Sequence, residues 1–200
     1  MEIEVKYQAG PEQAERLWQS PLIAPWLGES RRIPMEAVYY DTPQGDCAQA
    51  GFALRLRREG ERRVCAVKGG DLAGEDGVAR RVEIEAPADS LAQGVQALLR
   101  DPRLPGQWAA ALDGPLNQTV RMTFLRRAAD YRRQGLWVEL CYDQGEMKAG
   151  GRRASIGECE LELKQGSEQA FLELAAALEA QLGWSPWKQS KYARAKELMR

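Results

Sequence analysis

The chain has 200 residues, 44% of them hydrophobic, which is enough for one domain with a buried core. Its 28 basic and 29 acidic side chains leave a net charge of −1, which excludes a basic field over the whole molecule and predicts no nucleic-acid partner. The sequence has no histidine, and its four cysteines form no Cys-x-x-Cys pair, so a zinc site of ordinary spacing is excluded.

The first strand is predicted at residues 2–6, where charged and apolar side chains alternate strictly. Glu2, Glu4 and Lys6 share one face of this strand. The same opening does not resemble a secretory signal, and no long apolar span follows it in the chain. We therefore expect a cytoplasmic protein with reduced thiols and no membrane partner.

The rest of the chain alternates between strand and helix patterns. Helices are predicted at residues 12–18, 89–100, 171–182 and 188–199. Further strands are predicted at residues 37–40, 52–58, 63–68, 79–85, 120–126, 136–142 and 155–164. Turns are predicted at residues 41–43, 68–70 and 143–145, and Asp41 is expected to make local hydrogen bonds in its turn. No linker divides these elements, so we expect one domain spanning residues 1–200.

Several of these strands have one charged and one apolar face. Arg55 and Arg57 alternate with leucines, and three glutamates alternate with apolar residues in the last strand. A single strand of this kind is ordinarily half-buried, with its charges in water. When several occur together, helices can cover the apolar faces from outside, and a sheet that closes on itself encloses the charges. Enclosed charges are costly unless they are paired or bind a ligand, so this interior predicts a functional site.

Both signs of charge occur on these faces, and this restricts the ligand. Arg and Lys suit phosphate oxygens, whereas clustered carboxylates without His or Cys suit hard divalent cations such as Mg²⁺ or Mn²⁺. The basic candidates are Lys6, Arg55, Arg57, Lys68 and Arg81. The acidic candidates are Glu2, Glu4, Glu83, Glu85, Glu139, Asp143, Glu158, Glu160 and Glu162. A metal-chelated polyphosphate satisfies both sets.

The charged segments follow one another in the order of a known family pattern. They are residues 2–6, 39–43, 51–57, 67–69, 81–85, 157–164 and 190–192. Together they resemble the CYTH superfamily, the triphosphate tunnel metalloenzymes, and residues 138–150 are similar to its branch of bacterial inorganic triphosphatases. One departure is Arg126-Arg127, where the family usually has a single arginine, so either side chain could face the tunnel.

The resemblance implies an α+β fold, a closed antiparallel eight-stranded β-barrel with helices packed outside. It implies hydrolysis of a small-molecule triphosphate, first of all inorganic triphosphate to diphosphate and phosphate, with Mg²⁺ or Mn²⁺ as cofactor. The implied metal ligands are Glu2, Glu4, Glu158 and Glu160. The implied phosphate-binding residues are Lys6, Arg55, Arg57, Lys68, Arg81, Arg126 and Lys191. The implied catalytic residues are Glu4, Lys6, Asp143 and Glu162, of which the last two would bind metal or act on a water.

Three other functions remain open at this point. A class IV adenylate cyclase would hold ATP in the same tunnel and direct the ribose hydroxyl, in place of water, at the α-phosphate. A thiamine triphosphatase is the second alternative, and a polyphosphate or nucleotide sensor without turnover is the third. The contacts that would separate them lie at the tunnel mouth, and the chain could act as a monomer or a homodimer.

Overall fold

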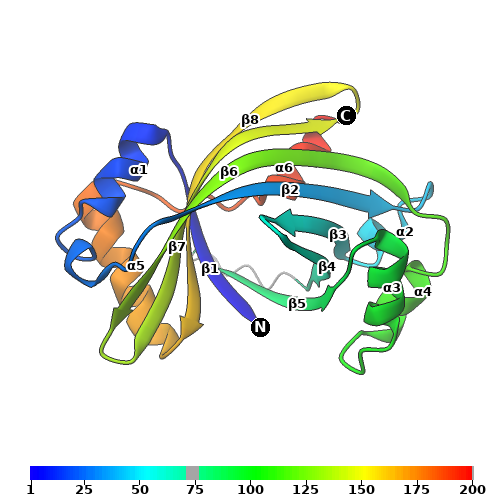
Figure 1. The fold of residues 1–200 in the computed structure, drawn as a ribbon, viewed down its shortest axis with the longest axis horizontal. Coiled ribbons are helices and arrows are strands. Elements are labelled where there is room, and N and C mark those ends of the chain that lie inside the picture. Colours follow the sequence, from blue (N-terminus) through cyan, green and yellow to red (C-terminus); the bar gives the residue numbers. More distant parts are fainter. Residues whose placement is uncertain (71–76, 200) are drawn as a thin grey trace.

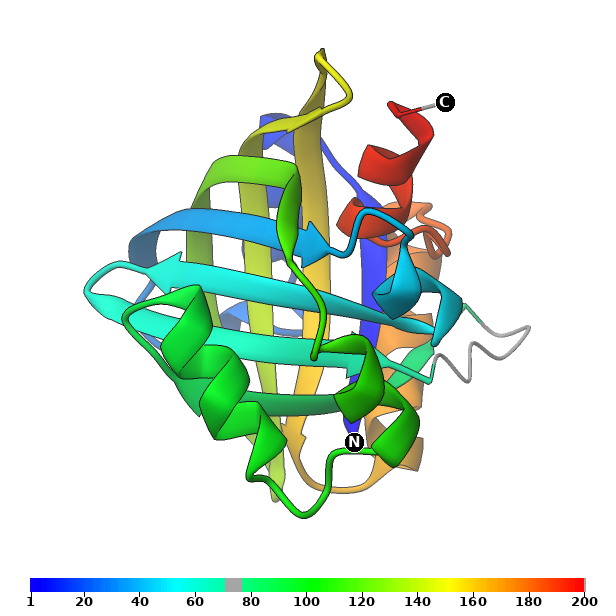
Figure 2. The ribbon, with the colours of Figure 1, turned by 90° about the vertical axis from the view of Figure 1, so that its right-hand side faces the viewer.

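The computed structural model describes residues 1–70 and 77–199 of the chain. Within these residues, eight antiparallel strands close into a barrel in the order β1-β5-β4-β3-β2-β6-β7-β8 (Figure 1). In Figure 2, β3 and β4 run across β1, β7 and β8, which lie behind them, so the barrel has two crossing walls. The predicted α+β fold with a closed eight-stranded barrel is confirmed.

Each predicted strand is present, and most are longer than predicted. Their bounds are β1 (Glu2–Gln8), β2 (Arg31–Asp41), β3 (Phe52–Glu59), β4 (Arg62–Gly69), β5 (Ala79–Pro87), β6 (Asn117–Arg133), β7 (Leu136–Ala149) and β8 (Arg152–Gln165). The strict alternation of charged and apolar residues fixes the register. A slip of one residue would move every charge to the outer face, against the helices.

The turn predicted at residues 143–145 is wrong, because these residues lie in the middle of β7. Asp143 pairs with Arg126 of β6 on one side and with Glu158 of β8 on the other. Gly145 marks a close backbone approach, since a Cβ atom there would collide with the carbonyl oxygen of Thr123. The chain instead turns after Ala149, at two glycines with positive φ angles.

The four predicted helices are also present. Their bounds are α1 (Pro11–Trp18), α3 (Leu91–Leu99), α5 (Glu168–Leu182) and α6 (Lys191–Glu197). Ser90, Ser167 and Ser190 cap the last three, each accepting a hydrogen bond from a backbone N–H in the first turn. Three short elements were not predicted, namely the 3₁₀ helix η1 (Ala24–Trp26), α2 (Asp46–Gln49) and α4 (Gly106–Ala111).

Asp41 has the structural role predicted for it. Its Oδ1 accepts hydrogen bonds from the backbone N–H groups of Thr42, at 2.8 Å, and Cys47, at 2.9 Å. Its Oδ2 accepts a third from Ala48, at 3.2 Å. The buried carboxylate therefore ties the end of β2 to the start of α2.

Two apolar cores lie outside the barrel and one lies inside. On the outside, α1 and α5 cover β1, β7 and β8 with residues such as Leu17 and Phe171, and α3 and α4 cover β3 to β5 with residues such as Leu98. The inner core lies where α6 packs against β6 and β7. Because the outer cores hold the strands in place, the rest of the interior can remain polar.

Candidate functional site

The charged faces of the strands line one cavity of about 540 Å³ inside the barrel. Its basic lining residues are Lys6, Arg55, Arg57, Arg62, Lys68, Arg81, Arg126, Lys164, Lys191 and Lys196. Its acidic lining residues are Glu2, Glu4, Glu59, Glu83, Glu85, Glu139, Glu160 and Glu162. The two signs nearly balance, so an anion that enters the cavity displaces carboxylates from their ion pairs or brings cations with it.

One wall of the cavity is a row of cations on β3, β4 and β5. Arg55 lies 3.1 Å from Glu83, and Lys68 bridges Glu83, at 3.1 Å, to Glu2, at 2.8 Å. Arg57 lies 3.3 Å from Glu85. These pairs hold the cationic side chains extended into the cavity, where each can exchange a carboxylate partner for a phosphate oxygen.

Two donors in this row suit an anionic ligand. The Nε atoms of Arg55 and Arg57 are buried, and neither has a hydrogen-bond acceptor in the described part of the chain. Burial and the neighbouring charge of Arg55 also lower the pKa of Arg57. A buried donor without an acceptor is destabilising, and a bound anion would supply the acceptor.

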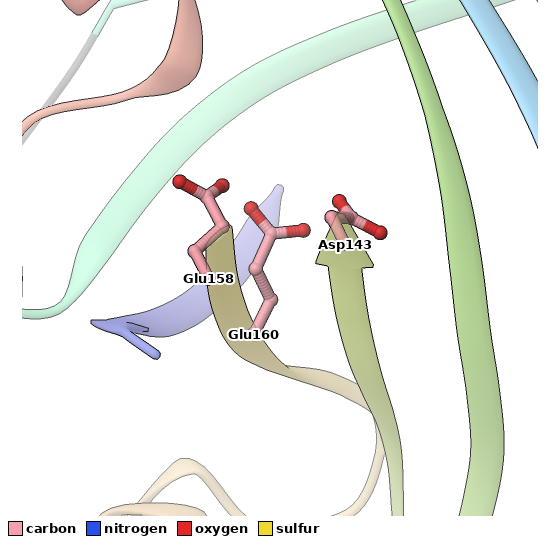
Figure 3. Close-up of side chains that lie close together, drawn as sticks. All are labelled: Asp143, Glu158 and Glu160. Carbon is pink, nitrogen blue, oxygen red and sulfur yellow. The ribbon is translucent and has the colours of Figure 1, made fainter. Parts of the chain in front are cut away.

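Opposite this row, three carboxylates lie close together (Figure 3). Asp143 comes from β7, and Glu158 and Glu160 come from β8, with one oxygen of each within 4.8 Å of the others. Arg126 lies 2.7 Å from Asp143 and 2.9 Å from Glu160. Lys191 of α6 lies 2.9 Å from Asp143 and 2.8 Å from Glu160, and it also contacts Glu158.

The carboxylates differ in how readily they ionise. Although burial alone would raise the pKa of Glu160, the charges of Lys191, Arg126 and Lys6 hold it well below its ordinary value. Burial raises the pKa of Glu158. Burial, with the charge of Glu2 as a smaller cause, raises the pKa of Glu162 to about 7. Glu160 is therefore ionised at neutral pH, whereas Glu162 exchanges its proton there.

The residues implied as metal ligands separate into two places. Glu158 and Glu160 belong to the acidic cluster, which contains neither Glu2 nor Glu4 among the residues described. Glu2 pairs with Lys68, and Glu4 pairs with Lys6, at 2.7 Å, and with Arg81. Glu2, Glu4 and Glu160 line the cavity, but Glu158 is completely buried outside it.

The donor set fits a hard divalent cation. All of the clustered ligand atoms are carboxylate oxygens, and the chain has no histidine that would favour zinc. Among the residues described, the cluster contains none of the four cysteines, and burial raises the pKa values of their thiols. The chemistry of these oxygens therefore supports Mg²⁺ or Mn²⁺ without selecting between them.

All seven residues implied as phosphate-binding line the cavity. Among the residues implied as catalytic, Glu4, Lys6 and Glu162 line it too, whereas Asp143 is completely buried behind Arg126. The structure also settles which of the adjacent arginines faces inward. Arg126 points into the tunnel, and Arg127 lies outside, 2.8 Å from Glu15 and stacked on Trp18.

Sequence patterns missed several residues of the site. Glu59 continues the alternation of Arg55 and Arg57, so extending the predicted strand by one position, from residue 58 to residue 59, would have found it. Arg62, the first residue of β4, lies across the hairpin from Glu59 and also lines the cavity. Lys196 lies four residues after Tyr192 on α6, and both line the cavity, but only the docking of this helix brings them there.

A model of the CYTH domain matches residues 1–194 of the chain. The chain belongs to the CYTH family. Solved structures with the same fold include a Hippeastrum protein described as a candidate adenylyl cyclase with a dominant triphosphatase activity. It is 21% identical, with a TM-score of 0.66, over 100% of this chain and 97% of that one.

Two further solved structures resemble the chain at lower identity. A Pyrococcus horikoshii protein is 17% identical, with a TM-score of 0.61, and the match covers 99% of both chains. A candidate adenylate cyclase from Bacillus halodurans is 17% identical, with a TM-score of 0.56, over 97% of this chain and 96% of that one. At these identities the likeness shows the fold. None of the helices described is both long and apolar enough to cross a membrane.

Proposed function

We propose that this CYTH protein is a divalent-metal-dependent triphosphatase that hydrolyses inorganic triphosphate to diphosphate and phosphate. The observation that carries the proposal is the cavity of about 540 Å³ inside the barrel, in which a row of cations stands opposite carboxylates. A linear triphosphate is elongated, highly charged and rich in hydrogen-bond acceptors. It therefore matches the cations along its length and leaves the carboxylates for an accompanying metal ion.

The cations would bind the phosphate oxygens and hold the chain of phosphates straight. Arg55, Arg57 and Lys68 would bind from one wall, and Arg126 and Lys191 from the other. The buried Nε donors of Arg55 and Arg57 would gain acceptors in the complex. Positioning and charge stabilisation of this kind account for most of the catalysis of phosphoryl transfer.

The carboxylates would hold the metal ion and receive the proton of the attacking water. Glu2, Glu4 and Glu160 line the cavity and offer oxygen ligands. A bound divalent cation would neutralise phosphate oxygens and lower the pKa of a water molecule. Glu162, with a pKa raised to about 7, matches a general base at neutral pH. Asp143 would act through Arg126, which it orients with two hydrogen bonds.

The proposal is tested by phosphate release from inorganic triphosphate, ATP and thiamine triphosphate, each with Mg²⁺, with Mn²⁺ and with EDTA. We expect fast release from inorganic triphosphate that requires metal. Release that persists in EDTA would contradict the metal assignment. Binding of all three compounds without release would instead support a sensor.

ATP cyclisation is the second candidate, and one observation favours it. Tyr39, Phe124 and Tyr192 line the cavity beside the charged walls and could contact an organic group attached to the triphosphate. The same assay therefore includes detection of cyclic AMP. Its formation at a rate above phosphate release would replace hydrolysis as the proposed reaction.

A further inference from the structure

Glu158 differs from the other carboxylates of the acidic cluster in its partners, because both of its ion pairs are with α6, whereas Asp143 and Glu160 also pair with Arg126 of β6. It is completely buried and does not line the cavity, whereas Glu160, two residues further along β8, does. Its two oxygens contact two cations of α6, Lys191 at Oε1 and Arg194 at Oε2. Arg194 donates a hydrogen bond to Oε2, whereas Oε1 makes an ion pair with Lys191 but has no hydrogen bond in the described part of the chain.

Arg194 reaches Glu158 but not the cavity. Its side chain is 11% exposed and is absent from the cavity lining, and its guanidinium carbon lies 3.9 Å from the centre of the Trp187 ring. Trp187 is itself attached to the barrel, because its backbone N–H donates to the carbonyl oxygen of Lys6 at 2.7 Å. The planar guanidinium stacks its face on the ring while its edge donates to the carboxylate, a geometry that a compact lysine ammonium does not reproduce.

The position of α6 depends on contacts of this kind. With seven residues, the helix is too short to be stable by itself. Lys191 and Arg194 are three residues apart and so share one face, which meets the acidic cluster. Tyr192 stacks on Tyr39, with ring centres 4.5 Å apart, and Ala195 is buried. Like the contact of Lys191 with Glu158, the pair of Arg194 and Glu158 joins two nearly buried charges.

We propose that Glu158 and Arg194 form a buried anchor for α6, which positions Lys191 in the cavity to bind a triphosphate. Arg194 is then a positioning residue that acts through Lys191, and Glu158 is part of the anchor, not a metal ligand. The inference rests on the proposed function, because it assumes that the cavity binds a triphosphate. It differs from that function in assigning Glu158 and Glu160 separate tasks.

The first test is binding of inorganic triphosphate, measured by calorimetry in EDTA so that no turnover occurs. Arg194→Met should raise the Kd about five- to tenfold, because α6 loses its anchor and Lys191 its position. Adding Arg194→Met to Lys191→Met should have no further effect, since the residue through which Arg194 acts is gone. Equal effects of Arg194→Met in both backgrounds would overturn the proposal.

The second test separates an anchor from a metal ligand. We expect Glu158→Gln to change the affinity for Mn²⁺, measured from the resonance signal of the free ion, by less than about twofold, and Glu160→Gln to lower it about tenfold or more. The double variant Glu158→Gln/Arg194→Met should bind triphosphate more tightly than Arg194→Met, because the buried carboxylate that lost one of its two cations is then replaced by a neutral amide. Loss of Mn²⁺ by Glu158→Gln to the same extent as by Glu160→Gln would overturn the anchor.

Arg127→Met is the matched control, because Arg127 also stacks on a tryptophan and pairs with a glutamate, but outside the barrel. It should bind triphosphate like the wild type, and an effect equal to that of Arg194→Met would overturn the proposal. If Arg194→Met does not fold, Arg194→Lys replaces it, with a smaller rise in Kd expected and an unchanged Kd overturning the anchor.

Failure of the anchor and failure of the proposed hydrolysis give different results. A wild-type protein that binds triphosphate with this dependence on Arg194 but releases no phosphate would overturn the proposed hydrolysis and support the anchor. Wild-type turnover with normal binding by Arg194→Met would overturn the anchor alone, and a wild type that does not bind triphosphate would overturn both.

Discussion

The interior of the barrel has an apolar part and a charged part, and the same strands supply both. Along β6, the inward side chains change from Met122 to Arg126, and along β7 they change from Met147 to Asp143. The apolar part is filled by α6, whereas the charged part encloses the cavity. The alternation within a strand determines which residues face inward. Which part of that interior is filled with apolar side chains depends on where α6 packs.

The largest effect is expected from removing a carboxylate of the charged part. Glu160→Ala should lower the rate of phosphate release from inorganic triphosphate about 10³-fold or more, because it removes a ligand of the metal ion and a partner of Arg126 and Lys191. Glu146→Ala, on the neighbouring strand but paired with Lys148 at the surface, is the control and should keep its rate. A folded Glu160→Ala protein with normal kinetics would refute the assignment.

Substitutions in the apolar part should lower the stability of the fold. Met147 is 1% exposed in the core beneath α6, so Met147→Ala should lower the free energy of unfolding by about 3 kcal/mol. Urea denaturation measures this change. Met199→Ala, at an exposed position, should change it by less than about 0.5 kcal/mol. A loss for Met147→Ala as small as that expected for Met199→Ala would mean that the region beneath α6 is not a packed core.

Adjacent arginines on β3 sharpen the contrast between the two sides of the barrel wall. Arg57 lines the cavity, whereas the neighbouring Arg58 has an exposed side chain. Arg57→Ala should lower kcat/KM for inorganic triphosphate about 10²-fold through lost contacts in the transition state, and Arg58→Ala should leave it unchanged. Steady-state kinetics on both variants would contradict this placement if the two losses were equal.

Alternation within strands predicted the cavity lining, whereas the resemblance to the family implied that the sheet closes into a barrel. The period of two placed Glu2, Arg55 and Glu160 on inward faces without knowledge of any partner strand. The alternation could not show that β7 continues through Gly145. In the sequence, a glycine at a close backbone approach cannot be distinguished from a glycine in a turn.

The same period could not separate Glu158 from Glu160. Both face the interior, and they differ because α6 covers one and leaves the other in the cavity. The contact between Arg194 and Glu158 joins residues 36 positions apart in sequence, and no local pattern encodes it. Tertiary docking of a short helix therefore decides which of two equivalent carboxylates is available for chemistry.

The smallest effect on turnover is expected from alkylation of cysteine, and Cys141, which lies on β7 opposite Glu160, is the thiol concerned. Its thiol faces the charged part but is 3% exposed, and burial raises its pKa well above the ordinary value, although Arg126 opposes the shift. Since the thiolate is the reactive form, N-ethylmaleimide at neutral pH should leave turnover of the native protein unchanged. The reagent should label all four cysteines after unfolding in guanidinium. Inhibition of the native protein with labelling of Cys141 would show that this part of the wall opens, so the boundary between cavity and core would be less fixed than the packing indicates.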